Sequence, residues 1–162
     1  AGSTQVTPPS PPRYASELRG VSPRSAAIRV EPNGWSLPTL PTNMVALASR
    51  HTVRGTLLGW PVEVRFRPIR YHWTFGDGQG RSTSSAGNTW QQLRVQQFDE
   101  TATAHRYARP GSYTIGLRVD YRAEFRFVDG DFRDISGTVQ ARARSVQIDV
   151  LTVSPLLMGS AD

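Results

Sequence analysis

The segment Tyr71-His72-Trp73-Thr74-Phe75-Gly76-Asp77-Gly78 has the strongest local pattern in the chain. Its aromatic residues occupy alternate positions, as in a strand that buries one face. Two glycines flank Asp77, and glycine permits the positive φ angles of tight turns. The segment therefore predicts a strand that ends in a sharp turn, in which the Asp77 carboxylate meets backbone donors.

A second block reads His105-Arg106-Tyr107-Ala108-Arg109-Pro110-Gly111-Ser112-Tyr113-Thr114. Its Pro-Gly pair is a turn signal, and an alternating run then extends from Tyr113 to Phe127. A straight strand of that length would reach roughly 50 Å at ~3.3 Å per residue, which is longer than usual. We therefore expect a bend or a break near Asp120, or a ribbon that crosses from one sheet edge to another.

Other segments also alternate with period two, namely 62–66, 139–143 and 146–150. Asp129-Gly130-Asp131 predicts a hairpin turn between Phe127 and Phe132. Helical periodicity is weak throughout, and Thr89 to Phe98 is its only candidate. Repeated short strands with frequent turns are typical of a β-sandwich.

The two blocks together resemble the signature of the PKD (polycystic kidney disease) domain family, Trp-Asp-Phe-Gly-Asp-Gly followed by His-x-Tyr and Pro-Gly-x-Tyr. The resemblance covers roughly residues 44–151 and implies an all-β, immunoglobulin-like (PKD-type) antiparallel β-sandwich. Thr74 departs from the usual acidic residue, and insertions near 79–98 and 124–137 enlarge the domain. The chain is also similar to PKD-domain exported proteins of high-GC Gram-positive bacteria.

The resemblance implies structural roles for most of the matching residues. Tyr113, for example, is expected to bury its ring and keep its hydroxyl on a backbone carbonyl, and His105 is expected to hydrogen-bond near Asp77. The structural signature comprises Trp73, Phe75, Gly76, Asp77, Gly78, His105, Tyr107, Pro110, Gly111 and Tyr113.

Residues 1–43 contain many prolines, which exclude a long helix or a central strand. We expect a proline-rich extended arm or linker there, a β-sandwich over 44–151, and a C-terminal tail over 152–162. The chain has 162 residues, and 38% of them are hydrophobic. It is therefore large enough to form one hydrophobic core.

Cysteine is absent, which excludes disulfides and thiolate metal sites. No apolar run is long enough to span a bilayer. The sequence starts at Ala1 without a signal pattern, so its simplest interpretation is a mature chain whose export signal has been removed. We expect a secreted or cell-surface location.

The net charge is +6, and all 19 basic residues are arginine, as the codon usage of a GC-rich genome would produce. Such a chain attracts polyanions, including anionic wall polymers and acidic polysaccharides. Several arginines alternate with core positions and could form a basic binding surface, or they could pair across strands with Glu63, Glu124 and Asp149. These arginines are Arg65, Arg67, Arg118, Arg122, Arg126, Arg142 and Arg144.

Trp90 lies in the first insertion and is the best candidate for an exposed aromatic contact, such as stacking on a sugar ring. The acidic turn with Asp129, Asp131 and Asp134 suggests calcium, but its spacing matches no EF-hand loop, so a plain hairpin is favoured. The histidines show no spacing typical of a catalytic or metal site. We expect no enzyme activity, no metal and no cofactor.

These features favour an extracellular or cell-surface structural or interaction module that binds protein partners or further copies of itself, as in a homo-oligomer or a filament. Sheet edges, the insertions and the proline-rich arm would make the contacts. The alternative is a module that binds carbohydrate or an anionic cell-wall polymer. Nucleic acid is not expected as a partner because no motif combines aromatic and basic residues.

Overall fold

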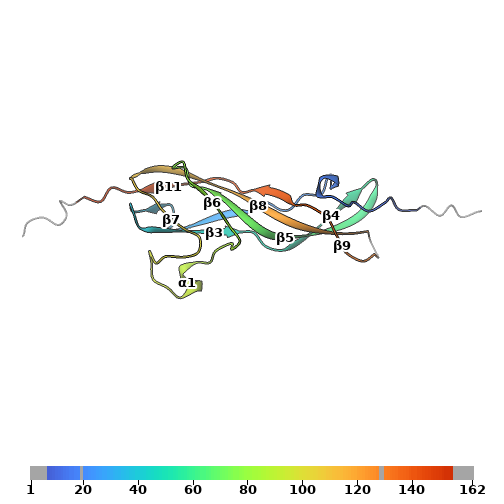
Figure 1. Ribbon diagram of the computed structural model, residues 1–162, viewed down its shortest axis with the longest axis horizontal. Coiled ribbons are helices and arrows are strands. Elements are labelled where there is room, and N and C mark those ends of the chain that lie inside the picture. The colour runs from blue at the N-terminus through green and yellow to red at the C-terminus, as the bar shows by residue number, and fades with distance from the viewer. Residues whose placement is uncertain (1–6, 19, 128–129, 155–162) are drawn as a thin grey trace, which may run out of the picture. The chain divides into compact units, whose positions relative to one another are not determined.

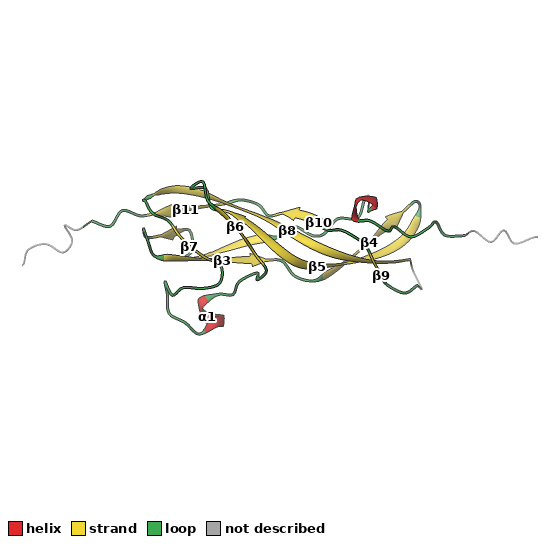
Figure 2. Ribbon diagram, in the orientation of Figure 1, coloured by secondary structure: helices red, strands yellow, loops and turns green. Residues whose placement is uncertain are grey.

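A computed structural model describes residues 7–18, 20–127 and 130–154, and they form an almost all-β structure (Figures 1 and 2). The strands are β1 (Ala27–Glu31), β2 (Trp35–Ser36), β3 (Pro41–Leu47), β4 (His51–Leu57), β5 (Trp60–Thr74), β6 (Gly80–Thr83), β7 (Ala104–Arg106), β8 (Gly111–Phe127), β9 (Arg133–Asp134), β10 (Val139–Arg142) and β11 (Val146–Val150). A 3-10 turn, η1 (Ala15–Glu17), and a short helix, α1 (Trp90–Leu93), complete the elements. None of the helices in these ranges is long and apolar enough to cross a membrane.

The chain divides into two compact units. The first unit comprises Ala1–Arg24, Ser49–Ile69 and Asp120–Ala141, and the second comprises Ser25–Ala48, Arg70–Val119 and Arg142–Asp162. β5 and β8 each contribute one part to either unit.

The second unit contains two sheets. One has the antiparallel order β1-β3-β7, and the other places β2, β11, β8 and β5 side by side, with β6 paired to β5. Side chains of both sheets are buried, among them Met44, Trp73, Tyr107, Ile115 and Ile148. The two sheets thus form the expected β-sandwich, and the alternation of β5 and β8 places its large residues in the core.

In the first unit, the N-terminal part of β5 pairs with β4 in the register Val53↔Val64, and β8 lies on its other side. Val64 and Phe66 of β5 are buried, and the Phe66 ring meets that of Tyr121 at 6.1 Å between centroids. The prediction that Val62, Val64 and Phe66 share one buried face is confirmed.

β8 is continuous from Gly111 to Phe127, so the alternative of a break near Asp120 is wrong. The division between the two compact units nevertheless falls between Val119 and Asp120. Because side chains alternate along the whole strand, one set of β8 residues supplies core positions in both units.

The boundary expected at residue 43 falls inside β3, and the expected arm contains β1 and β2. The prolines occupy positions that strands tolerate: Pro32 directly follows β1, and Pro41 is the first residue of β3. Nearer the N-terminus, Tyr14 forms an isolated parallel bridge with Ser136, and both residues belong to the first unit. This part of the arm therefore packs on its own chain.

The two expected insertions contain regular structure. Residues 79–98 include β6 and α1, whose first turn is capped by the Thr89 side chain and by Gln92 in return. Residues 124–137 include the end of β8 and β9, which pair as Glu124↔Asp134. The predicted hairpin is thus present, although Asp129 itself lies outside the described residues.

Candidate functional site

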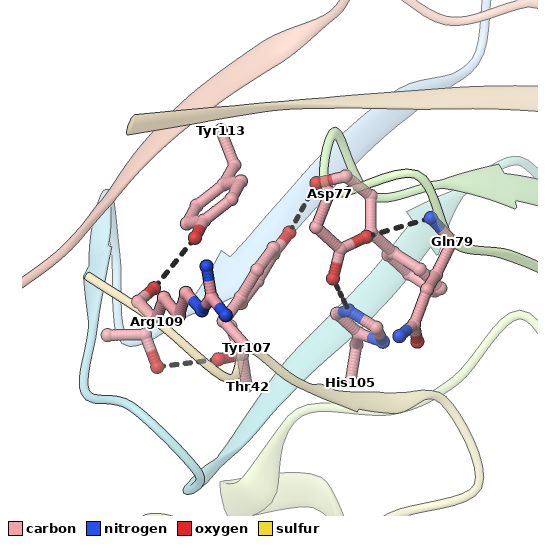
Figure 3. A network of polar contacts seen from close by, with 9 residues as sticks. Thr42, Asp77, Gln79, His105, Tyr107, Arg109 and Tyr113 are labelled. Carbon is pink, nitrogen blue, oxygen red and sulfur yellow. Dashed lines mark hydrogen bonds and ion pairs between the residues drawn. The ribbon is translucent and has the colours of Figure 1, made fainter. Parts of the chain in front are cut away.

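The signature turn at the end of β5 closes as its sequence predicts (Figure 3). Asp77 accepts a hydrogen bond from the Gln79 backbone N–H at 3.0 Å, and its other carboxylate oxygen lies 2.7 Å from His105 Nε2. The backbone N–H of Phe75 donates to the Gln79 carbonyl at 3.1 Å. The expected contact of His105 with the turn is therefore confirmed.

Aromatic rings pack around this turn. The His105 ring stacks on Phe75 at 3.8 Å between centroids, and the Tyr107 ring meets His105 edge-on at 4.7 Å. The Tyr107 hydroxyl donates to the Phe75 carbonyl at 2.8 Å, and the Tyr113 hydroxyl donates to the Arg109 carbonyl at 2.7 Å (Figure 3). Burial, followed by the nearby Asp77 charge, raises the pKa of Tyr107 and keeps its hydroxyl protonated as a donor.

These contacts give the signature residues structural roles. His105 and Tyr107 are buried, and the Trp73 ring is 2% exposed. The two remaining histidines lie elsewhere with partners of their own: His51 accepts from the Arg24 backbone N–H at 2.9 Å, and His72 lies 2.7 Å from the Ser82 hydroxyl. Within the described ranges, no three acidic or histidine side chains gather in a way that could hold a metal ion.

Ion pairs neutralise part of the predicted basic surface. Arg65 pairs with Glu124, and Arg126 pairs with Glu63 at 2.6 Å, so the cross-strand alternative is confirmed for these two. Both guanidiniums also lie over the Phe132 ring, at 3.5 and 4.4 Å from its centroid.

Only part of the predicted arginine set shares one concave surface. Arg65, Arg67 and Arg122 line a hollow of about 460 Å³ in the first unit, together with Arg50. Arg142 is exposed in the second unit, outside that hollow. The sequence pattern missed Arg50 because this residue precedes β4 and shows no alternation of its own.

The expectation of an exposed Trp90 is wrong, because its side chain is 7% exposed. Trp90 begins α1, its indole N–H donates to the Asp99 carbonyl at 3.1 Å, and its ring packs against Phe98. Phe98 also contacts Trp35 of β2, so the rings of Trp90 and Phe98 pack the insertion against that strand.

A larger concave surface of about 870 Å³, here called the β1 hollow, lies in the second unit beside the edge strand β1. Its apolar walls come from β1, β2, β3, the α1 loop and β11, and include Val30, Trp35, Leu47, Val95 and Val146. Leu47 is 50% exposed and Val95 is 40% exposed. No pattern along the chain predicts this surface, because its residues come from five separate elements.

Comparison with known proteins supports the family that the signature suggests. Residues 42–124 match the family model described as PKD domain. No curated protein and no solved structure matches the chain. PKD domains are non-catalytic, immunoglobulin-like domains that generally serve as extracellular modules for protein or carbohydrate interactions. With its closed signature network, its sandwich and a match over half of its length, this chain belongs to the PKD domain family.

Proposed function

We propose that the chain is an extracellular or cell-surface, non-catalytic module that joins further copies of itself through the β1 hollow. The observation that carries this proposal is the combination of an unpaired strand edge, among the described residues, with a hollow beside it that exposes the apolar side chains of Leu47 and Val95. β1 pairs only with β3 among the described residues, so its other edge is available to an extended segment. A segment added there would gain backbone hydrogen bonds and place alternate side chains in the hollow.

The chain itself offers a suitable segment directly after β11. Leu151 and Val153 are 45% and 64% exposed, and they are spaced two residues apart, as a strand needs to present both on one face. Burial of these exposed apolar side chains by a second copy would stabilise the complex. An addition of this kind is heterologous, so repeated copies would form a ring or a filament.

Other features support a bacterial origin and the absence of catalysis. The arginine-only composition supports an origin in a high-GC genome, as in the exported PKD-domain proteins of Gram-positive bacteria that the chain resembles. A hydrogen bond joins His105 to Asp77, and the Tyr107 hydroxyl donates to a backbone carbonyl. These contacts support a structural role for the three side chains.

The experiment compares the Leu47→Asp/Val95→Asp double variant with Leu58→Asp by sedimentation velocity over a range of concentrations. Leu58 is 77% exposed and lies in the first unit, so it provides an apolar-to-acidic change outside the hollow. We expect the native chain and Leu58→Asp to associate and the double variant to remain monomeric. A native chain that stays monomeric at every concentration contradicts the proposal.

Carbohydrate binding in the same hollow is the second candidate. Trp35 is half-buried there, and the amides of Asn33, Gln91 and Gln97 line the surface. An aromatic face with amide groups around it suits a sugar ring and its hydroxyls. Glycan binding that is lost in Trp35→Ala, with self-association unchanged, would favour this function over self-assembly.

A further inference from the structure

The hollow in the first unit has an unusual concentration of guanidinium groups. Arg50, Arg65, Arg67 and Arg122 line it, and Glu124 and Asp134 are the only carboxylates that the described residues contribute to its walls. Four positive and two negative side chains leave a net charge of +2 in a volume of about 460 Å³. We call this surface the arginine hollow.

Three of these four arginines have no ion-pair partner within the described residues. Glu124 is engaged by Arg65, so their charges offset each other. Arg50, Arg67 and Arg122 are exposed, and within the part of the chain that the structure describes they make no ion pair or side-chain hydrogen bond. Each therefore retains its full set of N–H donors for a ligand.

The strand register brings these like charges together. Arg65 and Arg67 share one face of β5 and are two residues apart, or about 7 Å. His51 lies opposite Phe66, and the same register continued by one residue places Arg50 opposite Arg67. Arg122 comes from β8, the other neighbour of β5. Like charges directly opposite each other destabilise a sheet, and a bound anion would relieve that repulsion.

We propose that the arginine hollow binds an anionic polysaccharide through its carboxylate or phosphate groups. A guanidinium group can form bidentate hydrogen bonds with a carboxylate or with a phosphate. The sheet holds these groups in a rigid arrangement. The volume suits about one charged sugar unit. Because the site is exposed, a single unit binds weakly, and the repeated anions of a polymer supply the affinity.

This inference goes beyond the self-association proposed above, since it uses another unit, other residues and another ligand. The test measures binding to immobilised protein of three purified polysaccharides: polygalacturonate, a phosphomannan and neutral dextran. We expect one or both anionic polymers to bind and dextran not to bind. The anionic polymer that binds more tightly identifies carboxylate or phosphate as the group recognised.

Two variants with the same change in net charge locate the site. Arg67→Gln/Arg122→Gln should weaken binding at least about tenfold, whereas Arg142→Gln/Arg144→Gln should change it by no more than about threefold. Asp134→Asn, which removes a carboxylate that makes no ion pair within the described residues, should strengthen binding. All five substituted side chains are exposed, so folding should be retained and circular dichroism provides the check.

Several outcomes would overturn the proposal. Equal losses in the two double variants would mean that the overall charge, not the hollow, attracts the polymer. Binding of duplex DNA as tight as that of the anionic glycans, with the same dependence on Arg67 and Arg122, would show that the ligand class is wrong. Leu47→Asp/Val95→Asp should bind the polymer normally, so the failure of one proposal can be distinguished from the failure of the other.

Discussion

Gly76 and Gly78 have almost the same backbone angle, with φ of 83° and 84°, but different surroundings. A Cβ added at Gly76 would lie 2.6 Å from the Thr114 carbonyl oxygen and 2.7 Å from its nitrogen, whereas one added at Gly78 meets nothing within 4 Å. Gly78→Ala should therefore cost only the left-handed strain, about 1–2 kcal/mol. Gly76→Ala should cost roughly 3–5 kcal/mol, because the backbone of β8 must also move.

Urea unfolding of the two alanine variants measures this difference directly. The pair is matched because both positions lie in the same turn and carry the same strain. Equal losses would show that β8 yields to the new methyl group without cost, and that Thr114 does not require a glycine opposite it.

At the residue scale, the hydrogen bonds of the signature were predictable, including the contact of His105 with Asp77, whereas the packing of aromatic rings was not. The Asp77 turn and the Tyr113 hydroxyl follow from residues close in sequence, and both are confirmed. The stacking of His105 on Phe75 joins β7 to the residue that follows β5, and no pattern along the chain predicts it. The exposure expected of Trp90 rests only on its place in an insertion, whereas its ring packs on Phe98, which in turn contacts Trp35 of β2.

Three strands of the first unit meet at Glu63. Arg54 of β4 lies 3.1 Å from this carboxylate and Arg126 of β8 lies 2.6 Å from it. The Arg126 hydrogen bond, with the charges of both arginines, holds the pKa of Glu63 below its ordinary range despite the opposing effect of desolvation. Glu63 is thus the electrostatic link between β5 and its two neighbours.

This lowered pKa predicts an acid dependence of stability. A depressed pKa stabilises the fold above the unfolded value of about 4.3, and that stabilisation is lost as the pH falls through the lower folded value. Chemical unfolding from pH 7 to pH 2 should therefore show a smaller acid loss in Glu63→Gln than in the native chain. An unchanged pH profile in the variant would mean that other carboxylates cause the loss.

At the element scale, length decided which strands could be predicted. β5 and β8 span 15 and 17 residues, so their alternation is clear. β1 and β2 are short and lie among prolines, and the composition therefore suggested an extended arm. Of the four arginines that line the arginine hollow, Arg65, Arg67 and Arg122 were predictable from the alternation of the sequence. Arg50 was not, because only the pairing of β4 with β5 places it there.

On the scale of the whole molecule, the two compact units cannot be separated by cutting the chain once. β5 and β8 pass from one unit into the other, and each unit comprises three separate stretches. The family match over residues 42–124 also omits β1, β2 and β11, although all three are paired in the second unit. The folded domain therefore extends beyond the matched segment.

Two N-terminal truncations test that length. A chain that starts at Met44 lacks β1, β2 and the first residues of β3, and thus one edge of the β1-β3-β7 sheet. A chain that starts at Gly20 keeps every strand and loses the Tyr14–Ser136 bridge with its two hydrogen bonds, Ala15 N–H to Ser136 and Ser136 N–H to Arg13. We expect the first chain to be unfolded and the second to fold with about 1–3 kcal/mol less stability.

Thermal unfolding followed by circular dichroism gives the stability, and sedimentation velocity on the same samples gives the assembly. Because the β1 hollow is intact in the chain that starts at Gly20, its self-association should equal that of the full chain. If that shorter chain folds but stays monomeric, residues 1–19 make the intermolecular contact and the hollow does not. A cooperatively folded chain that starts at Met44 would show instead that β1 is dispensable for the sandwich, contrary to its place in the sheet.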